Sequence, residues 1–188
     1  QGKVYVGSYG DLGYLSADEK GKLRFVSLSH LIPPKHQPFY DIWTIKLVEG
    51  DVFFHTDKRI FRYDGRDIQV YQVFERTDNL NIESAFVYRD HYYFMAGKKG
   101  LFRVVSDTLE QVINGAGLVT GVETITRLEG NRFLFIARDR FYVLDMERRV
   151  VEPFDSPDAG YFLENQLYKG LVGMGNHMAV GTSLGGVV

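Results

Sequence analysis

The sequence predicts an all-β fold made of repeated units, and three observations support this. A short apolar strand, a polar turn and a second apolar strand recur five times. The second strand of each pair opens on a small residue or an arginine, with steps of 46, 41, 40 and 46 residues between successive openings, at Gly13, Arg59, Gly100, Arg140 and Gly186. No helical period is sustained. A strand-only repeat with a period near forty is typical of β-propeller blades, so we expect a β-propeller fragment of about four blades.

Each blade is predicted to contain three to four antiparallel strands separated by turns. The repeat units run approximately over 1–40, 41–82, 83–122, 123–167 and 168–188, and the last one is incomplete. The second unit is the clearest, with strands expected over 41–47, 52–56, 60–63 and 68–71. The turn pairs Glu49-Gly50 and Asp64-Gly65 punctuate this unit, and Asp-Gly is a strong hairpin signal.

The third and fourth units repeat the same plan. Strands are expected over 85–88, 92–95, 101–105 and 109–113, and then over 125–128, 133–136, 141–144 and 150–154. One helical candidate, Leu28 to Ile32, precedes Pro33-Pro34 and is at most one turn long, because proline cannot continue a helix. The longer connections join an outer strand to the next inner strand, on one face of the propeller around its channel mouth, at 29–40, 74–82, 114–122 and 155–168. Loops on a rigid scaffold are where binding residues gather.

Composition excludes several classes of function. The net charge is −2 and the pI is about 6.2, so no basic surface for nucleic acid is expected. Cysteine is absent, which excludes disulfides and thiolate metal sites. No apolar run is long enough to span a membrane. The five histidines form no pair at metal-ligand spacing, and no Gly-x-Ser-x-Gly elbow occurs, so no metal, cofactor or catalytic residue is predicted.

Three acidic residues start equivalent strands and are candidates for a site. Aligning the units places Glu83 opposite Glu123, with Asp41 one position before the equivalent residue Ile42. Such residues could accept local backbone hydrogen bonds, form a ring that binds sugar hydroxyls or a cation, or act as the catalytic set of a propeller glycosidase. The residue pattern leaves these three interpretations open.

Aromatic residues supply the other candidates. Trp43 is the sole tryptophan, and its place in an inner strand favours packing between blades over sugar binding. Tyr40 and Tyr161 lie in the channel-side loops, where an aromatic ring can contact a ligand or partner. The candidate ligand-binding residues are therefore Tyr40, Asp41, Glu83, Glu123 and Tyr161.

Four segments resemble a known family, the bacterial two-component regulator propellers. They are Gly7–Leu15, Phe39–Ile45, Val52–Gly65 and Gly181–Val187. In that family, two propellers commonly form the extracytoplasmic sensor of a membrane-anchored signalling protein, and the output inside the cell is a histidine kinase, a diguanylate cyclase or a helix-turn-helix regulator. The resemblance implies a non-catalytic, ligand-sensing propeller on the periplasmic or extracellular side of a bacterial inner membrane, which reaches the membrane only through parts absent here. Its implied partner is a small polar ligand such as an oligosaccharide.

Two other classes of function stay open at this stage. A carbohydrate-active propeller, a lyase or glycosidase, would use Asp41, Glu83 and Glu123. A protein-interaction scaffold would expose apolar residues such as Phe39 and Phe162 on a flat loop face. A piece of a propeller also has unpaired strand edges, which invite association. We therefore expect a homodimer, through the propeller or through missing domains.

Overall fold

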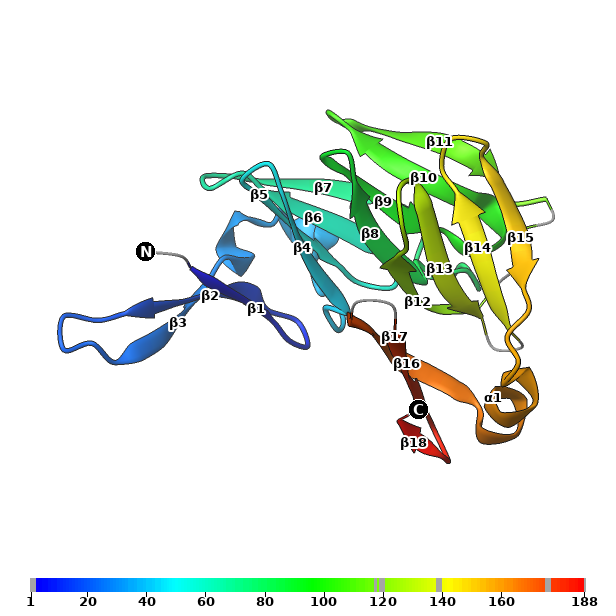
Figure 1. Ribbon diagram of the computed structural model, residues 1–188. Helices are drawn as coiled ribbons and strands as arrows, with labels where there is room; N and C mark the ends of the chain where they lie inside the picture. Colours follow the sequence, from blue (N-terminus) through cyan, green and yellow to red (C-terminus); the bar gives the residue numbers. More distant parts are fainter. Residues whose placement is uncertain (1–2, 117, 119–120, 138–139, 175–176, 188) are drawn as a thin grey trace. The chain divides into compact units, whose positions relative to one another are not determined.

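The computed structural model describes residues 3–116, 118, 121–137, 140–174 and 177–187 (Figure 1). The described residues form five antiparallel sheets of three or four strands each. In every sheet the hydrogen-bonded neighbours are strands consecutive in the sequence. The all-β, propeller-like fold predicted from the repeat is therefore confirmed. The exact bounds of the repeat units stay a prediction. They fall in the loops between sheets, and the sheets do not show at which loop residue one unit ends and the next begins.

The first two sheets cover the N-terminal part of the chain. The first contains β1 (Val4–Gly7), β2 (Leu12–Ala17) and β3 (Leu23–Ser27). The second contains β4 (Thr44–Val48), β5 (Asp51–His55), β6 (Arg59–Tyr63) and β7 (Ile68–Gln72). The Asp-Gly signal folds as expected: the Asp64 carboxylate accepts the backbone N–H groups of Arg66 and Asp67, each at 2.8 Å, and Gly65 has a φ of 99°.

The other three sheets follow in the same order along the chain. The third contains β8 (Ser84–Tyr88), β9 (His91–Met95), β10 (Gly100–Val105) and β11 (Thr108–Asn114). The fourth contains β12 (Val122–Arg127), β13 (Arg132–Ala137), β14 (Phe141–Asp145) and β15 (Val150–Phe154). The fifth contains β16 (Leu167–Met174), β17 (His177–Thr182) and β18 (Gly186–Val187).

These sheets belong to two compact units. The first unit comprises Gln1–Ile82, Val87–Tyr92 and Val104–Leu109, and the second comprises Glu83–Phe86, Tyr93–Arg103 and Glu110–Val188. The third sheet therefore supplies residues to both units.

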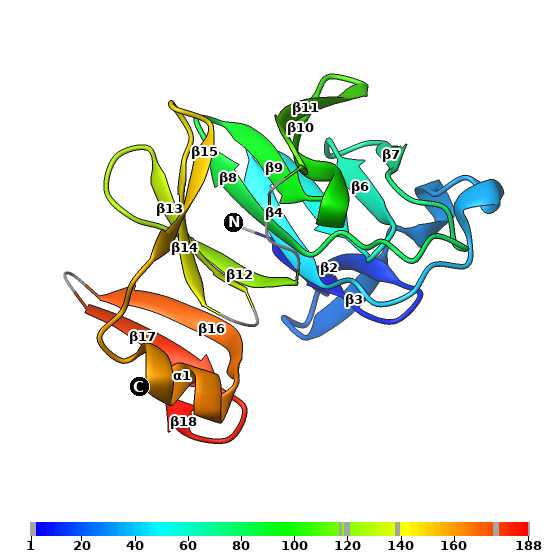
Figure 2. The same cartoon turned by 90° about the vertical axis from the view of Figure 1, so that its right-hand side faces the viewer.

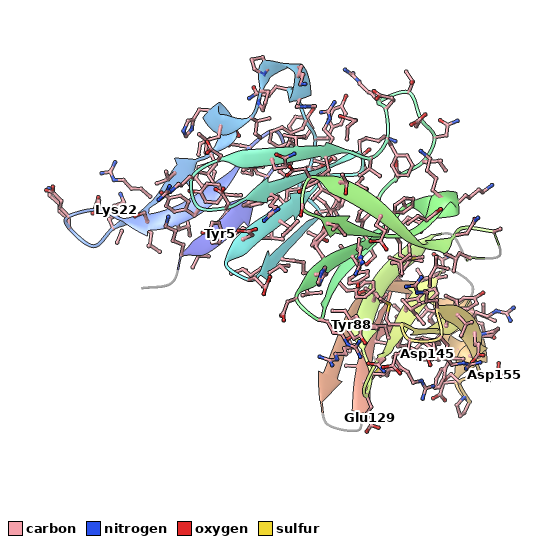
Figure 3. All side chains as sticks on the ribbon, turned by 90° about the horizontal axis from the view of Figure 1, so that it is seen from above. Tyr5, Lys22, Tyr88, Glu129, Asp145 and Asp155 are labelled. Atoms are coloured by element: carbon pink, nitrogen blue, oxygen red, sulfur yellow. The ribbon has the colours of Figure 1, made fainter. Side chains whose placement is uncertain are left out.

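The core of the first unit forms where one face of the first sheet packs on the second. Phe54 and Phe61 are fully buried there, next to Leu12. Tyr5, which Figure 3 labels, lies on β1. Its ring lies 6.1 Å from that of Phe54 and 6.4 Å from that of Tyr63, edge to face in both cases. Such edge-on contacts suit the charge distribution of aromatic rings. The side chains of β5 from Val52 to His55 are all buried, which explains why this strand reads as a continuous apolar run.

The second unit has its own apolar cluster. Leu134 and Ile136 on β13 and Phe141 and Val143 on β14 pack with Phe162, and all five are buried. The rings of Phe141 and Phe162 meet edge to face at 5.1 Å. This cluster holds the segment that connects the fourth sheet to the fifth.

The sequence analysis predicted a loop over residues 155–168, and this prediction is wrong for part of the segment. Residues Ala159–Asn165 form a short helix, α1, beside the strands of the fifth sheet (Figure 2). Seven residues give no sustained period, and a helix this short is marginal without tertiary contacts. Its C-terminal end supplies those contacts, because the carbonyls of Asn165 and Gln166 accept the N–H groups of Leu184 and Ser183 at 3.2 and 2.8 Å.

Among the described residues, the other helical segments are single 3-10 turns: η1 (Ser29–Leu31), η2 (Pro34–His36) and η3 (Gly97–Lys99). The first confirms that the Leu28 to Ile32 segment makes no more than one turn. The second begins at Pro34, whose fixed φ suits the first position of such a turn. Together η1 and η2 shape the loop that leads to Tyr40.

Candidate functional site

The first unit presents an exposed group of aromatic and charged residues, Tyr9, Tyr40, Asp41 and Arg76, called here the aromatic surface. The rings of Tyr9 and Tyr40 lie 5.9 Å apart with an angle of 50° between their planes. The guanidinium carbon of Arg76 lies 5.7 Å from the centre of the Tyr40 ring. Tyr9 is 68% exposed and Tyr40 is 37% exposed. Two accessible rings beside an arginine and a carboxylate offer stacking, cation–π and hydrogen-bonding groups to a ligand.

The backbone fixes the spacing of Tyr9 and Asp41. These two residues form an isolated antiparallel bridge, and the Ile42 N–H donates to the Ser8 carbonyl at 3.4 Å. Gly10 follows Tyr9 with a φ of 70°, a left-handed conformation that few other residues adopt easily. The two tyrosines, from turns more than thirty residues apart in sequence, are thus brought together by strand pairing.

The Asp11 carboxylate secures the base of these turns. Its Oδ1 atom accepts the hydroxyl protons of Ser27 and Ser29 at 2.7 and 2.5 Å, and the N–H of Leu12 at 2.8 Å. Burial alone would raise the pKa of Asp11, but these hydrogen bonds favour the charged form and hold the pKa below its ordinary value. A single carboxylate therefore ties the β1–β2 turn to the start of the loop that carries Tyr40.

Arg59 holds the far end of that same loop. Its NH1 group donates to the carbonyls of His36 and Pro38 at 3.0 and 3.4 Å, while its Nε donates to the Gln72 side chain at 2.6 Å. Phe39, directly before Tyr40, is buried against the ring of Phe61 at 4.9 Å. The position of Tyr40 is therefore set by the buried Phe39 directly before it and by the hydrogen bonds of Arg59 to the preceding residues.

Of the sequence candidates, Tyr40 and Asp41, which are adjacent in the chain, lie on this surface, and the structure brings Tyr9 and Arg76 to them. Tyr9 and Arg76 were missed by the sequence analysis. The length of the 74–82 connection was the available signal for Arg76, because long loops on a rigid scaffold carry function.

The expectation that Trp43 packs between blades is wrong. Its side chain is 56% exposed. Ile42, the preceding residue, is packed against the core cluster of the first unit, and successive residues in an extended segment point to opposite sides. Trp43 therefore points away from that core, two residues after Asp41.

Glu83 and Glu123 belong to the second unit, whereas Asp41 belongs to the first. The Glu83 carboxylate accepts the N–H groups of Gly121 and Val122 at 2.9 and 3.1 Å, one through each oxygen. It thus fastens the start of β12, the local backbone role considered for these acids. The Glu123 side chain lies outside the described part of the structure. The role of these acids as a ligand-binding or catalytic set stays a hypothesis.

Tyr161 lies on α1 and is 40% exposed. Its hydroxyl donates to the Gly185 carbonyl at 3.1 Å, in the turn between β17 and β18. A Cβ atom at Gly185 would come within 2.3 Å of this hydroxyl, so the glycine is needed for the close approach. The contact docks the helix on the fifth sheet, and the Tyr161 side chain stays partly exposed.

Two apolar residues expected to be exposed in a protein-interaction scaffold are buried. Phe39 is 3% exposed and Phe162 is 7% exposed. Each fills the space next to an aromatic ring of its own unit, Phe61 and Phe141 respectively. The expected flat apolar loop face built on these two side chains is therefore not formed.

Within the described ranges, no three histidine, aspartate or glutamate side chains gather closely enough to hold a metal ion. Among the same residues, no helix has the length and apolar character needed to cross a bilayer.

Comparison with solved structures identifies proteins of similar fold. The extracellular domain of BT3049 from B. thetaiotaomicron, assigned to a hybrid two-component system, matches with a TM-score of 0.65 and 18% identity, over 98% of this chain and 24% of that chain. The extracellular domain of BT4673 from the same organism, assigned to a one-component system, matches with a TM-score of 0.57 and 20% identity, over 75% of this chain and 19% of that one. The computationally designed Ika8 protein matches with a TM-score of 0.53 and 12% identity, over 100% of this chain and 61% of Ika8.

These neighbours agree with the family resemblance found in the sequence. The fold is that of a β-propeller fragment of the kind found in extracellular domains of bacterial sensor systems. The chain spans about a quarter or less of the length of the two sensor domains. A scan of protein-family models finds no match, and no curated protein matches.

Proposed function

We propose that this chain is part of a ligand-sensing propeller in the extracellular domain of a bacterial membrane-anchored signalling protein, on the periplasmic or extracellular side of the inner membrane. The sensing role is non-catalytic: a small polar ligand, for example an oligosaccharide, binds at the aromatic surface. The observation that carries the proposal is the convergence of Tyr9, Tyr40, Asp41 and Arg76 on loops that are fixed by hydrogen bonds to a rigid sheet.

The chemistry of this surface suits a polar ligand with apolar patches. The faces of sugar rings carry C–H groups that pack on aromatic rings, and their hydroxyls hydrogen-bond to groups such as Asp41 and Arg76. Both rings are held before a ligand arrives, so little conformational freedom is lost on binding. The similarity of the fold to extracellular domains of sensor systems also supports the sensing role.

The signalling consequence follows from linkage. A ligand shifts the arrangement of two sensor chains only if it binds one arrangement more tightly than the other. The proposal therefore includes a homodimer, formed through the propeller or through domains outside this chain. Gel filtration with light scattering of the chain at micromolar concentration, with and without the ligand, measures association through the propeller, and a monomer under both conditions would argue against that route.

The carbohydrate-active alternative has less support. The Glu83 carboxylate accepts one backbone N–H at each oxygen and so already has a structural role at the start of β12. Incubating the chain with polysaccharides and assaying for new reducing ends separates this alternative from the sensor proposal.

A binding screen tests the sensor proposal directly. The chain is heated with individual oligosaccharides, amino acids and nucleotides, and its unfolding temperature is recorded. A ligand at 100 times its dissociation constant stabilises the folded state by about 2.7 kcal/mol, which is a clear shift. Any hit is then measured by titration calorimetry with Tyr40→Ala and Arg76→Ala. We expect both variants to lose at least about tenfold in affinity, since each removes a direct contact.

Phe154→Ala is the matched control, because it removes a partly exposed aromatic side chain from the second unit that is not among the candidate ligand-binding residues. The site assignment fails if a ligand binds the Tyr40→Ala variant as well as it binds the original chain. If no compound of any class binds, the sensor proposal loses its support and a protein partner becomes the better explanation.

A further inference from the structure

Lys58 of the first unit is surrounded by polar groups that match its donors. It lies in the turn between β5 and β6, and its side chain is 14% exposed. Its Nζ atom donates to the carbonyls of Asp78 and Leu80 at 2.8 and 2.6 Å, and to Oδ1 of Asn81 at 2.7 Å. An ammonium group has three N–H donors, and here three oxygens receive them.

All three oxygens belong to one loop, residues 75–81, called here the Arg76 loop. The backbone of the Lys58 turn holds both ends of this loop as well. The Lys58 carbonyl accepts the N–H groups of Val73 and Phe74, each at 3.1 Å, and the Asp57 carbonyl accepts the N–H of Ile82 at 2.7 Å. The ends are therefore fixed by the backbone, and the middle is fixed by one side chain.

The turn itself is well suited to act as a support. Thr56 is only 2% exposed, and its hydroxyl oxygen accepts the N–H groups of Lys58 and Arg59 at 3.1 and 3.0 Å. Arg59, the next residue, holds the loop that carries Tyr40. Two adjacent cations, Lys58 in the turn and Arg59 at the start of β6, thus hold the two loops whose residues Arg76 and Tyr40 meet at 5.7 Å.

We propose that the Lys58 ammonium is the internal cation of a three-oxygen cage that positions Arg76 against Tyr40. Lys58 is a positioning residue: it acts on the aromatic surface through the Arg76 loop and does not itself contact Tyr40. Without it, two carbonyls and an amide oxygen converge on a point that holds no donor, and the loop relaxes. The inference concerns the surface itself and holds whichever ligand that surface binds.

The geometry makes two predictions that a simple charge effect would not. Arginine at this position keeps the positive charge but spreads its donors over a flat fork, so it cannot direct three N–H groups to three oxygens around one nitrogen. Lys58→Arg should therefore fail to maintain the loop. A small primary ammonium ion, in contrast, can enter the space left in Lys58→Ala and donate the same three hydrogen bonds.

The test uses amide hydrogen exchange and NMR on the full chain, with no ligand present. In Lys58→Ala and Lys58→Arg we expect protection of the Glu75 and Asp78 amides, which bond within the loop, to fall by at least about tenfold. The side-chain protons of Arg76 should also lose the shift that the Tyr40 ring produces. Exchange of the Ile60 amide in β6 reports whether the sheet stays folded. Lys35→Ala is the control, because it removes an exposed cation from the neighbouring loop and leaves the cage intact.

The rescue experiment adds propylammonium chloride to Lys58→Ala, with tetramethylammonium chloride at the same concentration as the comparison. Propylammonium should restore protection of the loop, whereas tetramethylammonium has no N–H donor and should not. The inference is overturned if Lys58→Ala leaves the loop and the Arg76 shifts unchanged, or if Lys35→Ala disturbs them equally. If Lys58→Ala does not fold, Asn81→Ala removes one cage oxygen and must produce a smaller change of the same kind. Because no ligand is used, failure here is separate from failure of the sensor proposal.

Discussion

The Nδ1 atom of His55 lies 2.6 Å from the phenolic oxygen of Tyr92, and this buried hydrogen bond joins β5 of the second sheet to β9 of the third. His55 is 1% exposed and Tyr92 is likewise 1% exposed. Burial raises the pKa of the Tyr92 phenol well above its ordinary value, so the group stays neutral. The ring of Tyr92 also stacks on that of Phe53 at 4.6 Å, which places polar and apolar contacts side by side.

Replacing Tyr92 by phenylalanine tests the value of this hydrogen bond. Tyr92→Phe keeps the stacked ring but takes the hydroxyl partner from a buried nitrogen of His55. We expect the free energy of unfolding in urea to fall by about 1–3 kcal/mol. Tyr9→Phe, at a ring that is 68% exposed, is the control and should change it little. Equal effects of the two substitutions would show that the His55 contact contributes nothing specific.

The lowered pKa of Asp11 predicts a dependence of stability on pH. Its folded pKa lies below the unfolded value of about 3.9, so the contribution of Asp11 is present above that value and is lost as the pH falls through the folded pKa. Asp11→Asn should therefore flatten the decline in unfolding free energy below about pH 5. Urea titrations between neutral pH and the acid limit measure this slope. An unchanged slope in the variant would contradict the assignment of the charged form to these hydrogen bonds.

The close approach of Gly185 to Tyr161 gives a coupled prediction for the second unit. Gly185→Ala brings a methyl group against the Tyr161 hydroxyl, and the helix α1 must shift. In Tyr161→Phe the hydroxyl is absent, so adding Gly185→Ala should cost less. A double-mutant cycle by thermal unfolding should show a coupling of about 0.5–3 kcal/mol, as for residues in contact. Strict additivity would mean that the alanine is accommodated without meeting the tyrosine.

Alanine substitutions at two glycines with positive φ allow the cost of backbone strain to be distinguished from the cost of a steric clash. Gly100 has a φ of 112°, and a Cβ there would lie 2.1 Å from the Ile113 carbonyl oxygen. Gly130 has a φ of 61° with open space around it. Gly130→Ala should cost about 1 kcal/mol, the left-handed penalty alone, whereas Gly100→Ala should cost more than about 3 kcal/mol. Chemical denaturation of both variants gives the comparison, and similar losses would contradict it.

The fold could be predicted from the sequence because a strand-only repeat leaves few architectures, and because turn pairs such as Asp64-Gly65 have a direct backbone cause. The helix α1 could not, since its stability comes from the contacts of Asn165 and Gln166 with a turn nearly twenty residues later. The candidate site was predicted in part. Tyr40 and Asp41 stood out by position, but Tyr9 and Arg76 joined them only through strand pairing and loop anchoring.

Trp43 was predicted to be buried and is exposed, again because the sequence does not show which segments pack together. An aromatic residue next to an inner strand reads as core, and only the side taken by Ile42 decides which way the indole points. Alternation assigns two faces, yet it does not say which of them is covered. That information lies in the packing of other segments, so a single strand cannot carry it.

The order of the strands has a consequence for how the chain acquires its structure. In the described sheets, hydrogen-bonded neighbours are also neighbours in the sequence, so each sheet closes over a short stretch of chain. Only short loops have to close before the strand contacts form, so little conformational entropy is lost before those contacts stabilise the sheet. This favours rapid formation of each sheet. A polypeptide that emerges from a ribosome or an export channel can therefore complete one sheet before the next is available, and each finished sheet offers an apolar face on which its successor assembles.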